Sequence, residues 1–140
     1  MTTVVVRMLG ADDAARFDAA AAGFLDGIDA KVAAALVDDP SRHVAIAIDD
    51  GGIVGVAFAM LEDGRAGELV VADLVVAPSH RRRGIALRLL ARLLEHGRSL
   101  GCVEATLETG RDDAPVRALC AVAGGVEVPP PRVRVAFTLR

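Results

Sequence analysis

The stretch Asp73-Leu-Val-Val-Ala-Pro-Ser-His-Arg-Arg-Arg-Gly-Ile-Ala86 joins the end of an apolar strand to a basic loop and the start of a helix. A helix N-terminus that follows a loop of free N–H groups binds anions such as pyrophosphate. Gly84 lets the backbone approach a ligand without a Cβ, and Ala86 keeps the first helical turn narrow. The stretch therefore predicts either a nucleotide-like anion site or a solvated arginine cluster that caps a core helix.

The segments on both sides of this stretch alternate between strand and helix patterns. Upstream, we expect strands at 3–8, 42–48, 53–61 and 68–76, with helices at 14–24 and from an Asp26 cap to about 37. Downstream, we expect a helix at 85–100, a strand at 103–108, a helix capped by Asp113, and strands at 126–128 and 133–139. Three antiparallel strands then lead into a strand–helix–strand crossover, which is locally parallel. The sequence predicts a single α/β domain over 1–140 with a mixed sheet.

Composition restricts the class of protein. The chain has 140 residues, 53% of them hydrophobic and 25% charged, which excludes intrinsic disorder. A net charge of −3 argues against nucleic acid as a partner. No apolar run approaches the ~20 residues of a membrane span, and the run at 3–9 is too short for a signal peptide. We expect a cytoplasmic protein with reduced cysteines and no metal, and the bias of arginine over lysine suggests a GC-rich bacterial genome.

Several side chains are missing altogether. The chain contains no Tyr and no Trp, and neither Asn nor Gln occurs in it. Mechanisms that need a tyrosine hydroxyl or a side-chain amide as oxyanion donor are therefore excluded or require a substitute.

The run Arg81-x-x-Gly84-x-Ala86 resembles the acetyl-CoA motif R/Q-x-x-G-x-G/A of the GNAT N-acetyltransferases, and the order of elements around it is similar to theirs. The resemblance implies an acetyl-CoA-dependent N-acetyltransferase. It also implies that the strand at 74–76 carries a bulge and separates from the strand through Glu104. The backbone groups expected to hold the pantetheine and the pyrophosphate belong to Leu74, Val75 and Val76, and to Arg81, Arg82, Arg83, Gly84, Ile85 and Ala86.

Transfer to an amine needs a base or an anchor for the nitrogen. Asp73 is the first candidate, because it is the one charge in the apolar run 69–76, and burial there would raise its pKa. Its alternative is a structural aspartate. Glu68 is the second candidate, with an exposed turn carboxylate as its alternative. Glu104 and Glu108 share one strand face and can either carry a proton through water or form a solvated face.

Cys120 occupies the place of the acid that protonates the leaving thiolate. The family's pattern is similar to N-x-x-A-x-x-L-Y-x-x-x-G-F, and here Cys120 replaces its tyrosine and Gly125 its phenylalanine. A thiol has a reference pKa of about 8.5, against about 10 for tyrosine, and can donate a proton. The alternative is that Cys120 packs in the core and that water donates the proton.

One branch is more similar than the others, the small aminoglycoside 3-N-acetyltransferases, through Glu68, Asp73-Leu-x-Val, His80-Arg81-Arg82-x-Gly84 and Asp113-x-Pro115. That resemblance implies an antibiotic-resistance enzyme whose small cationic substrate is held by acids, here Asp112 and Asp113. The alternatives are a polyamine, amino-acid or protein N-terminal acetyltransferase, and a non-catalytic acyl-CoA-binding module. Strand edges near the C-terminus make a homodimer plausible.

Overall fold

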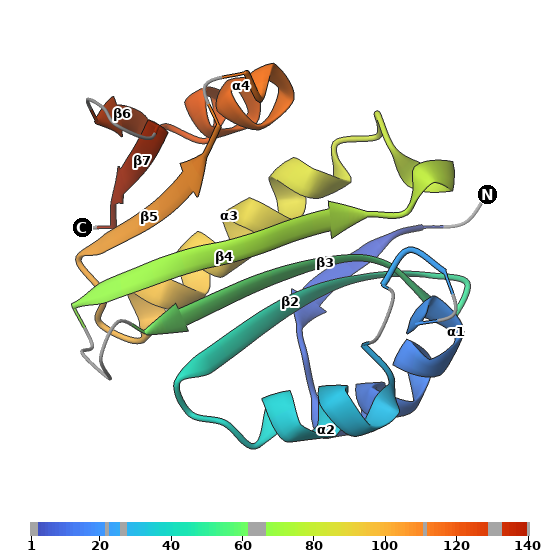
Figure 1. Ribbon diagram of the computed structural model, residues 1–140. Coiled ribbons are helices and arrows are strands. Elements are labelled where there is room, and N and C mark those ends of the chain that lie inside the picture. Colours follow the sequence, from blue (N-terminus) through green and yellow to red (C-terminus); the bar gives the residue numbers. More distant parts are fainter. Residues whose placement is uncertain are drawn as a thin grey trace.

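The computed structural model describes residues 3–21, 23–25, 28–61, 67–110, 112–128 and 133–139. Within these residues the strands form one sheet in the order β1-β2-β3-β4-β5-β7-β6 (Figure 1). The strands are β1 (Val5–Met8), β2 (Arg42–Asp49), β3 (Gly52–Leu61), β4 (Glu68–Val76), β5 (Glu104–Thr109), β6 (Val126–Val128) and β7 (Val133–Thr138). Neighbouring strands are antiparallel except β4 and β5, which are parallel. The predicted mixed α/β sheet with one parallel pair is confirmed.

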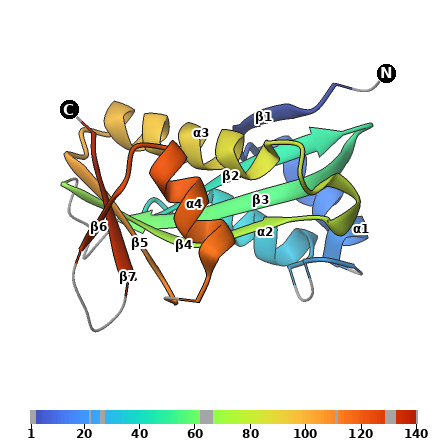
Figure 2. The ribbon, with the colours of Figure 1, turned by 90° about the horizontal axis from the view of Figure 1, so that it is seen from above.

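Helices cover both faces of the sheet. The helix α3 (Ile85–Ser99) lies on one face, and α1 (Phe17–Ala21) and α2 (Ala30–Val37) lie on the other (Figure 2). The helix α4 (Ala114–Val122) follows β5 and crosses near the end of the parallel pair. Because parallel neighbours need a crossover, α3 connects β4 to β5 across the sheet face.

The alternation along β2 explains the two layers. Val44 and Ile46 are buried beneath α1 and α2, whereas Ala45 and Ala47 are buried on the α3 side. Successive strand side chains point to opposite faces, so the alternating pattern builds two cores at once. The small residues let α3 approach closely: a Cβ on Gly55 would lie 2.9 Å from a methyl carbon of Leu89.

Two predicted helix starts differ from the observed ones. The first helical segment begins as a 3₁₀ turn, Ala11–Arg16, and its α-helical part ends at Ala21. The aspartate that caps α2 is Asp29, whose side chain accepts the Val32 N–H at 3.0 Å. The prediction of Asp26 as the cap is therefore wrong, and Asp26 itself lies outside the described residues. Several aspartates here have the short side chain that a cap needs, and packing selects among them.

The turn between β2 and β3 contains Asp50 and Gly51, residue types that favour a tight hairpin turn. Asp50 and Gly51 both have positive φ, 54° and 78°. This is the conformation of the two-residue turn that matches the twist of paired strands.

Candidate functional site

The strands β4 and β5 separate halfway along β4. Phe58 of β3 pairs with Asp73, and the next residue of β3 pairs with Val71, so Ala72 is an extra residue that forms a bulge. The pairing between β4 and β5 runs from Glu68 to Val71 and goes no further (Figure 1). The predicted bulge and separation are both present. Beyond the bulge, β4 presents an edge that β5 does not pair.

A cavity of about 200 Å³ lies in this opening, and we call it the splay cavity. It is lined by β4, β5 and the start of α4, through Val71, Ala72, Asp73, Leu74, Leu107, Glu108, Thr109, Asp113 and Val116. Each of the three elements contributes one carboxylate: Asp73, Glu108 and Asp113. Carboxylates gathered around one cavity favour a cationic group there.

Asp73 is exposed, although it lies within the apolar run 69–76. The bulge at Ala72 turns this part of β4 outward, and Ala72 is exposed as well. The Asp73 carboxylate accepts the Leu74 N–H at 2.8 Å. An N–H group has one hydrogen, so this amide does not point into the β3–β4 ladder. The Leu74 amide and the Asp73 carboxylate therefore lie together beside the splay cavity.

Asp113 has two contacts that fix it at the N-terminus of α4. Its carboxylate accepts the Val116 N–H at 3.3 Å and the Thr109 hydroxyl at 3.0 Å. Pro115 lies in the first turn of α4. The predicted cap is confirmed, and the same residue faces the splay cavity. Asp112, the neighbouring candidate, is exposed and is not among the residues that line the cavity.

The remaining acidic candidates lie apart. Glu68 and Glu104 are opposite each other at the paired end of β4 and β5. Asp73 lies five positions after Glu68, which is about 16 Å along the strand. Of the four glutamates and aspartates proposed on these two strands, the structure brings Asp73 and Glu108 to the splay cavity and leaves Glu68 and Glu104 at the other end.

The helix α3 begins after the far end of the open β4 edge. Gly84 is the N-cap with φ +75°, and no side chain caps the described helix start. A Cβ on Gly84 would meet nothing within 4 Å. The first N–H groups of a helix lack intrahelical partners, so they are available to an anion. The arginines Arg81, Arg82 and Arg83 are all exposed around this end.

Three contacts hold the loop before Gly84 in place, one of them within the loop itself. The Nε2 of His80 lies 2.7 Å from a carboxylate oxygen of Asp49, and the Ser79 hydroxyl lies 2.7 Å from Nδ1 of the same ring. The Arg81 Nε–H donates to the Val76 carbonyl at 3.2 Å. The loop is thus tied both to the β2–β3 hairpin and to the end of β4.

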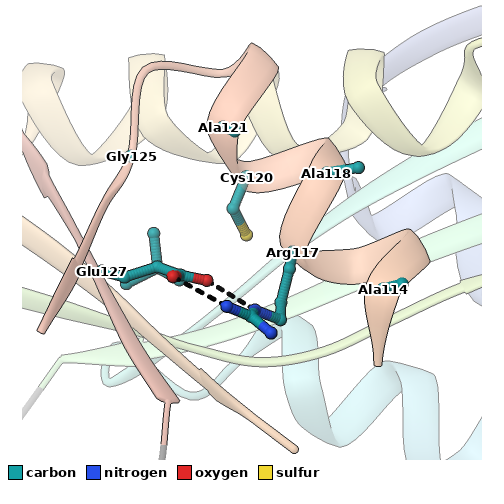
Figure 3. A pocket seen from close by; sticks show the side chains of 8 residues that line it. Ala114, Arg117, Ala118, Cys120, Ala121, Gly125 and Glu127 are labelled. Atoms are coloured by element: carbon teal, nitrogen blue, oxygen red, sulfur yellow. Dashed lines mark hydrogen bonds and ion pairs between the residues drawn. The ribbon is translucent and has the colours of Figure 1, made fainter. Parts of the chain in front are cut away.

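Cys120 lines a different cavity, of about 440 Å³, between α4 and the β6–β7 hairpin (Figure 3). Its side chain is buried, and it is not among the residues that line the splay cavity. Arg117 and Glu127 form a two-pronged ion pair beside it, with N–O distances of 2.6 and 3.0 Å. Burial, together with the charges of Glu127 and Asp113, raises the pKa of the Cys120 thiol. The thiol is therefore protonated at neutral pH.

The residue that replaces the family's phenylalanine has no space for a side chain. A Cβ on Gly125 would overlap a Val135 methyl carbon and lie 2.8 Å from the Phe137 ring. The two residues that depart from the family's pattern, Cys120 and Gly125, line the same cavity.

Sequence reasoning missed the position of the bulge, at Ala72 rather than within 74–76, together with the His80–Asp49 contact and the Arg117–Glu127 pair. The position of a bulge has no dependable sequence signature, and His80 and Asp49 are 31 residues apart in the chain. Arg117 and Glu127 have opposite charges and lie on either side of Gly124, where α4 ends, but their charges alone do not indicate that they pair.

Comparison with known proteins agrees with this fold. The family model "Acetyltransferase (GNAT) family" matches residues 13–124. The chain belongs to this family, whose members are acyltransferases. A comparison with curated protein sequences finds no match.

Solved structures share the fold over nearly the whole chain. A putative GNAT acetyltransferase from Desulfovibrio desulfuricans is 23% identical, with a TM-score of 0.75 over 99% of this chain and 100% of that one. YncA, a putative acetyltransferase from Salmonella typhimurium solved with acetyl-CoA, is 18% identical, with a TM-score of 0.75 over 98% of this chain and 94% of that one. The aminoglycoside N-acetyltransferase AAC(6')-Iy, in complex with CoA, is 19% identical, with a TM-score of 0.74 over 94% and 93%. In the described part of the chain, every helix is too short or too polar to cross a membrane.

Proposed function

We propose that this protein is an acetyl-CoA-dependent N-acetyltransferase that acts on a primary amine of a small cationic substrate, with the transfer taking place at the splay cavity. The observation that carries the proposal is the juxtaposition of the Asp73 carboxylate and the Leu74 N–H on the open edge of β4. One group attracts a cationic amine, and the other can donate to a carbonyl oxygen.

The residues present fit the donor. The unpaired edge at Leu74, Val75 and Val76 can pair with the amides of an extended pantetheine arm as an added strand would. The N–H groups from Arg81 to Ala86 surround an uncapped helix start, and open space lies at the Cβ position of Gly84. That arrangement suits a pyrophosphate. When bound, acetyl-CoA supplies the acetyl group as a thioester and departs as the CoA thiol.

Asp73 is the residue assigned to the amine. A primary amine is protonated at neutral pH, so it needs an anchor in that form and must lose a proton before its nitrogen can form the new C–N bond. Asp73 can hold the ammonium group and pass its proton to water, because the carboxylate is exposed. Release of the Leu74 N–H from Asp73 frees that amide for the acyl oxygen. The departing thiolate takes up a proton from water or from Cys120.

An aminoglycoside-type acceptor is a second candidate for the substrate. Glu108 and Asp113 line the same cavity as Asp73, and the exposed Asp112 adjoins them. Several carboxylates around one opening favour a substrate with several ammonium groups. The similarity of the fold to an aminoglycoside N-acetyltransferase is compatible with this candidate. A polyamine, an amino acid or a protein N-terminus would use the same anchor.

The test measures thiol release from acetyl-CoA with a panel of monoamines, polyamines, aminoglycosides and peptides. We expect release with at least one amine, and Asp73→Asn should lower turnover by about 10²-fold or more while the acetyl-CoA affinity changes less than threefold. Glu68→Gln is the matched control, since it removes a carboxylate from the other end of the same strand. Cofactor binding without any acetyl transfer would indicate a non-catalytic acyl-CoA-binding module. An equal loss of turnover and affinity in Asp73→Asn would make Asp73 structural.

A further inference from the structure

A second cavity, of about 390 Å³, lies between α2 and the sheet, and we call it the α2 pocket. Apolar side chains form most of its wall: Ile28, Val32, Leu36, Val44, Phe58 and Met60. Val32 and Met60 are each 40% exposed, which places them among the exposed large hydrophobic side chains of the described chain. Apolar surface left open around a concavity is a common property of ligand sites.

The α2 pocket meets the splay cavity at the bulge. Ala72 and Asp73 line both of them. Because the bulge leaves these two residues exposed, Asp73 forms the boundary between the apolar wall on one side and the open edge of β4 on the other. A molecule anchored by its nitrogen at Asp73 therefore has the α2 pocket directly available for the rest of its body.

The charges of the α2 pocket lie at its edge. Among the described residues that line it, Asp73 and Arg42 are the charged ones. Arg42 is half-exposed and is paired with Asp39, at an N–O distance of 3.4 Å. The rest of the wall has no side chain that can hydrogen-bond a hydroxyl or a second ammonium group. Placing such groups against this wall without partners is unfavourable.

We propose that the α2 pocket binds the hydrocarbon body of the acceptor, and that the preferred acceptor is therefore a monoamine with an alkyl or arylalkyl body. This proposal rests on the proposed function, because Asp73 is the amine anchor in both. The pocket selects against acceptors that extend a second charge or several hydroxyls away from the reacting nitrogen. The pocket therefore restricts the class of acceptor from small cations in general to amphipathic monoamines.

The test compares two amines that differ at one end, n-hexylamine and 1,6-diaminohexane, with 2-phenylethylamine and an aminoglycoside as further acceptors. The quantity measured is kcat/KM at saturating acetyl-CoA. We expect n-hexylamine and 2-phenylethylamine to exceed the diamine and the aminoglycoside by at least about tenfold, which is the discrimination an apolar pocket typically gives.

A charge placed in the wall should reverse this preference. Val32→Glu puts a carboxylate on α2 at a position that is 40% exposed, so the variant protein can fold without burying the new charge. It should lower kcat/KM for n-hexylamine and raise it for 1,6-diaminohexane. The matched control is Val122→Glu, since Val122 is 72% exposed on α4 and lines neither cavity. The control should keep the wild-type ratio of the two amines.

The outcomes separate the two proposals. Faster acetylation of the diamine or the aminoglycoside than of n-hexylamine would overturn the assignment of the pocket and leave the proposed function in place. An unchanged ratio in Val32→Glu would also overturn it. Failure to acetylate any amine would refute the proposed function, and the assignment of the pocket with it.

Discussion

Replacing Gly84 with alanine tests whether the start of α3 binds the donor. Gly84 has φ +75° and ψ 11°, which an L-residue with a Cβ adopts only at a cost. The new methyl group would meet nothing within 4 Å, so crowding inside the protein does not contribute. The effect of Gly84→Ala is therefore confined to the backbone conformation of the loop that is expected to hold the pyrophosphate.

The size of the effect follows from that conformation. The left-handed region costs an alanine roughly 1–2 kcal/mol relative to glycine. In the free variant the exposed loop relieves this strain by leaving the conformation, and binding must restore it. The apparent dissociation constant for acetyl-CoA should therefore rise by about 5- to 30-fold. Titration calorimetry with acetyl-CoA and with CoA measures the change directly.

The same helix offers a matched control. Gly101 follows the C-terminus of α3 with φ +86°, and a Cβ there would also meet nothing within 4 Å. Gly101→Ala imposes the same strain about 25 Å away along the helix. It should lower the free energy of unfolding by at most roughly 1–2 kcal/mol and leave the affinity for acetyl-CoA unchanged. Equal losses of affinity in both variants, or no loss in Gly84→Ala, would refute the assignment of the anion site.

Three further changes test other parts of the structure. Cys120→Ala should keep turnover within about threefold, because the thiol lines another cavity; a 10²-fold loss in steady-state kinetics would instead make it the proton donor. Asp13→Asn should lower the free energy of unfolding at pH 7 by about 1.5–3 kcal/mol in urea titrations, since it disrupts the hydrogen bonds that the half-exposed Arg7 donates to the buried Asp13 carboxylate. Arg7 lowers the pKa of Asp13, so the stabilisation by Asp13 is complete above pH ~4 and is lost as the pH falls through the lowered pKa. The same decrease in the free energy of unfolding with falling pH in wild type and variant would contradict this. Gly125→Ala should destabilise the protein by about 1–3 kcal/mol through overlap with β7, whereas Gly67→Ala, with open space around it, should not; equal midpoints of thermal unfolding would contradict the packing described.

Local patterns account for most of what the sequence predicts about the fold. The alternation in β2, the Asp50-Gly51 turn and the Asp113 cap each depend on neighbouring residues, and all three are present. The crossover around α3 follows from chain connectivity. The start of α2 was misplaced, because several nearby aspartates satisfy the same capping rule.

The site was less predictable, because its geometry depends on contacts between distant segments. The exposure of Asp73 follows from one extra residue at Ala72, which the apolar pattern of β4 does not reveal. Which cavity the Cys120 side chain faces depends on how α4 packs against the β6–β7 hairpin. The α2 pocket combines residues from α2, β2, β3 and β4, and no single stretch of sequence contains it. The backbone motif at Gly84 was visible from sequence because it is contiguous.

The most direct test of the central claim is mass spectrometry of a primary amine incubated with the protein and acetyl-CoA. We predict that the wild type increases the mass of n-hexylamine or of another panel amine by one acetyl group per primary amine, with CoA released in equal amount. Asp73→Asn should form this product at least about 10²-fold more slowly while still binding acetyl-CoA. Unmodified amines throughout, or full activity in Asp73→Asn, would contradict the account.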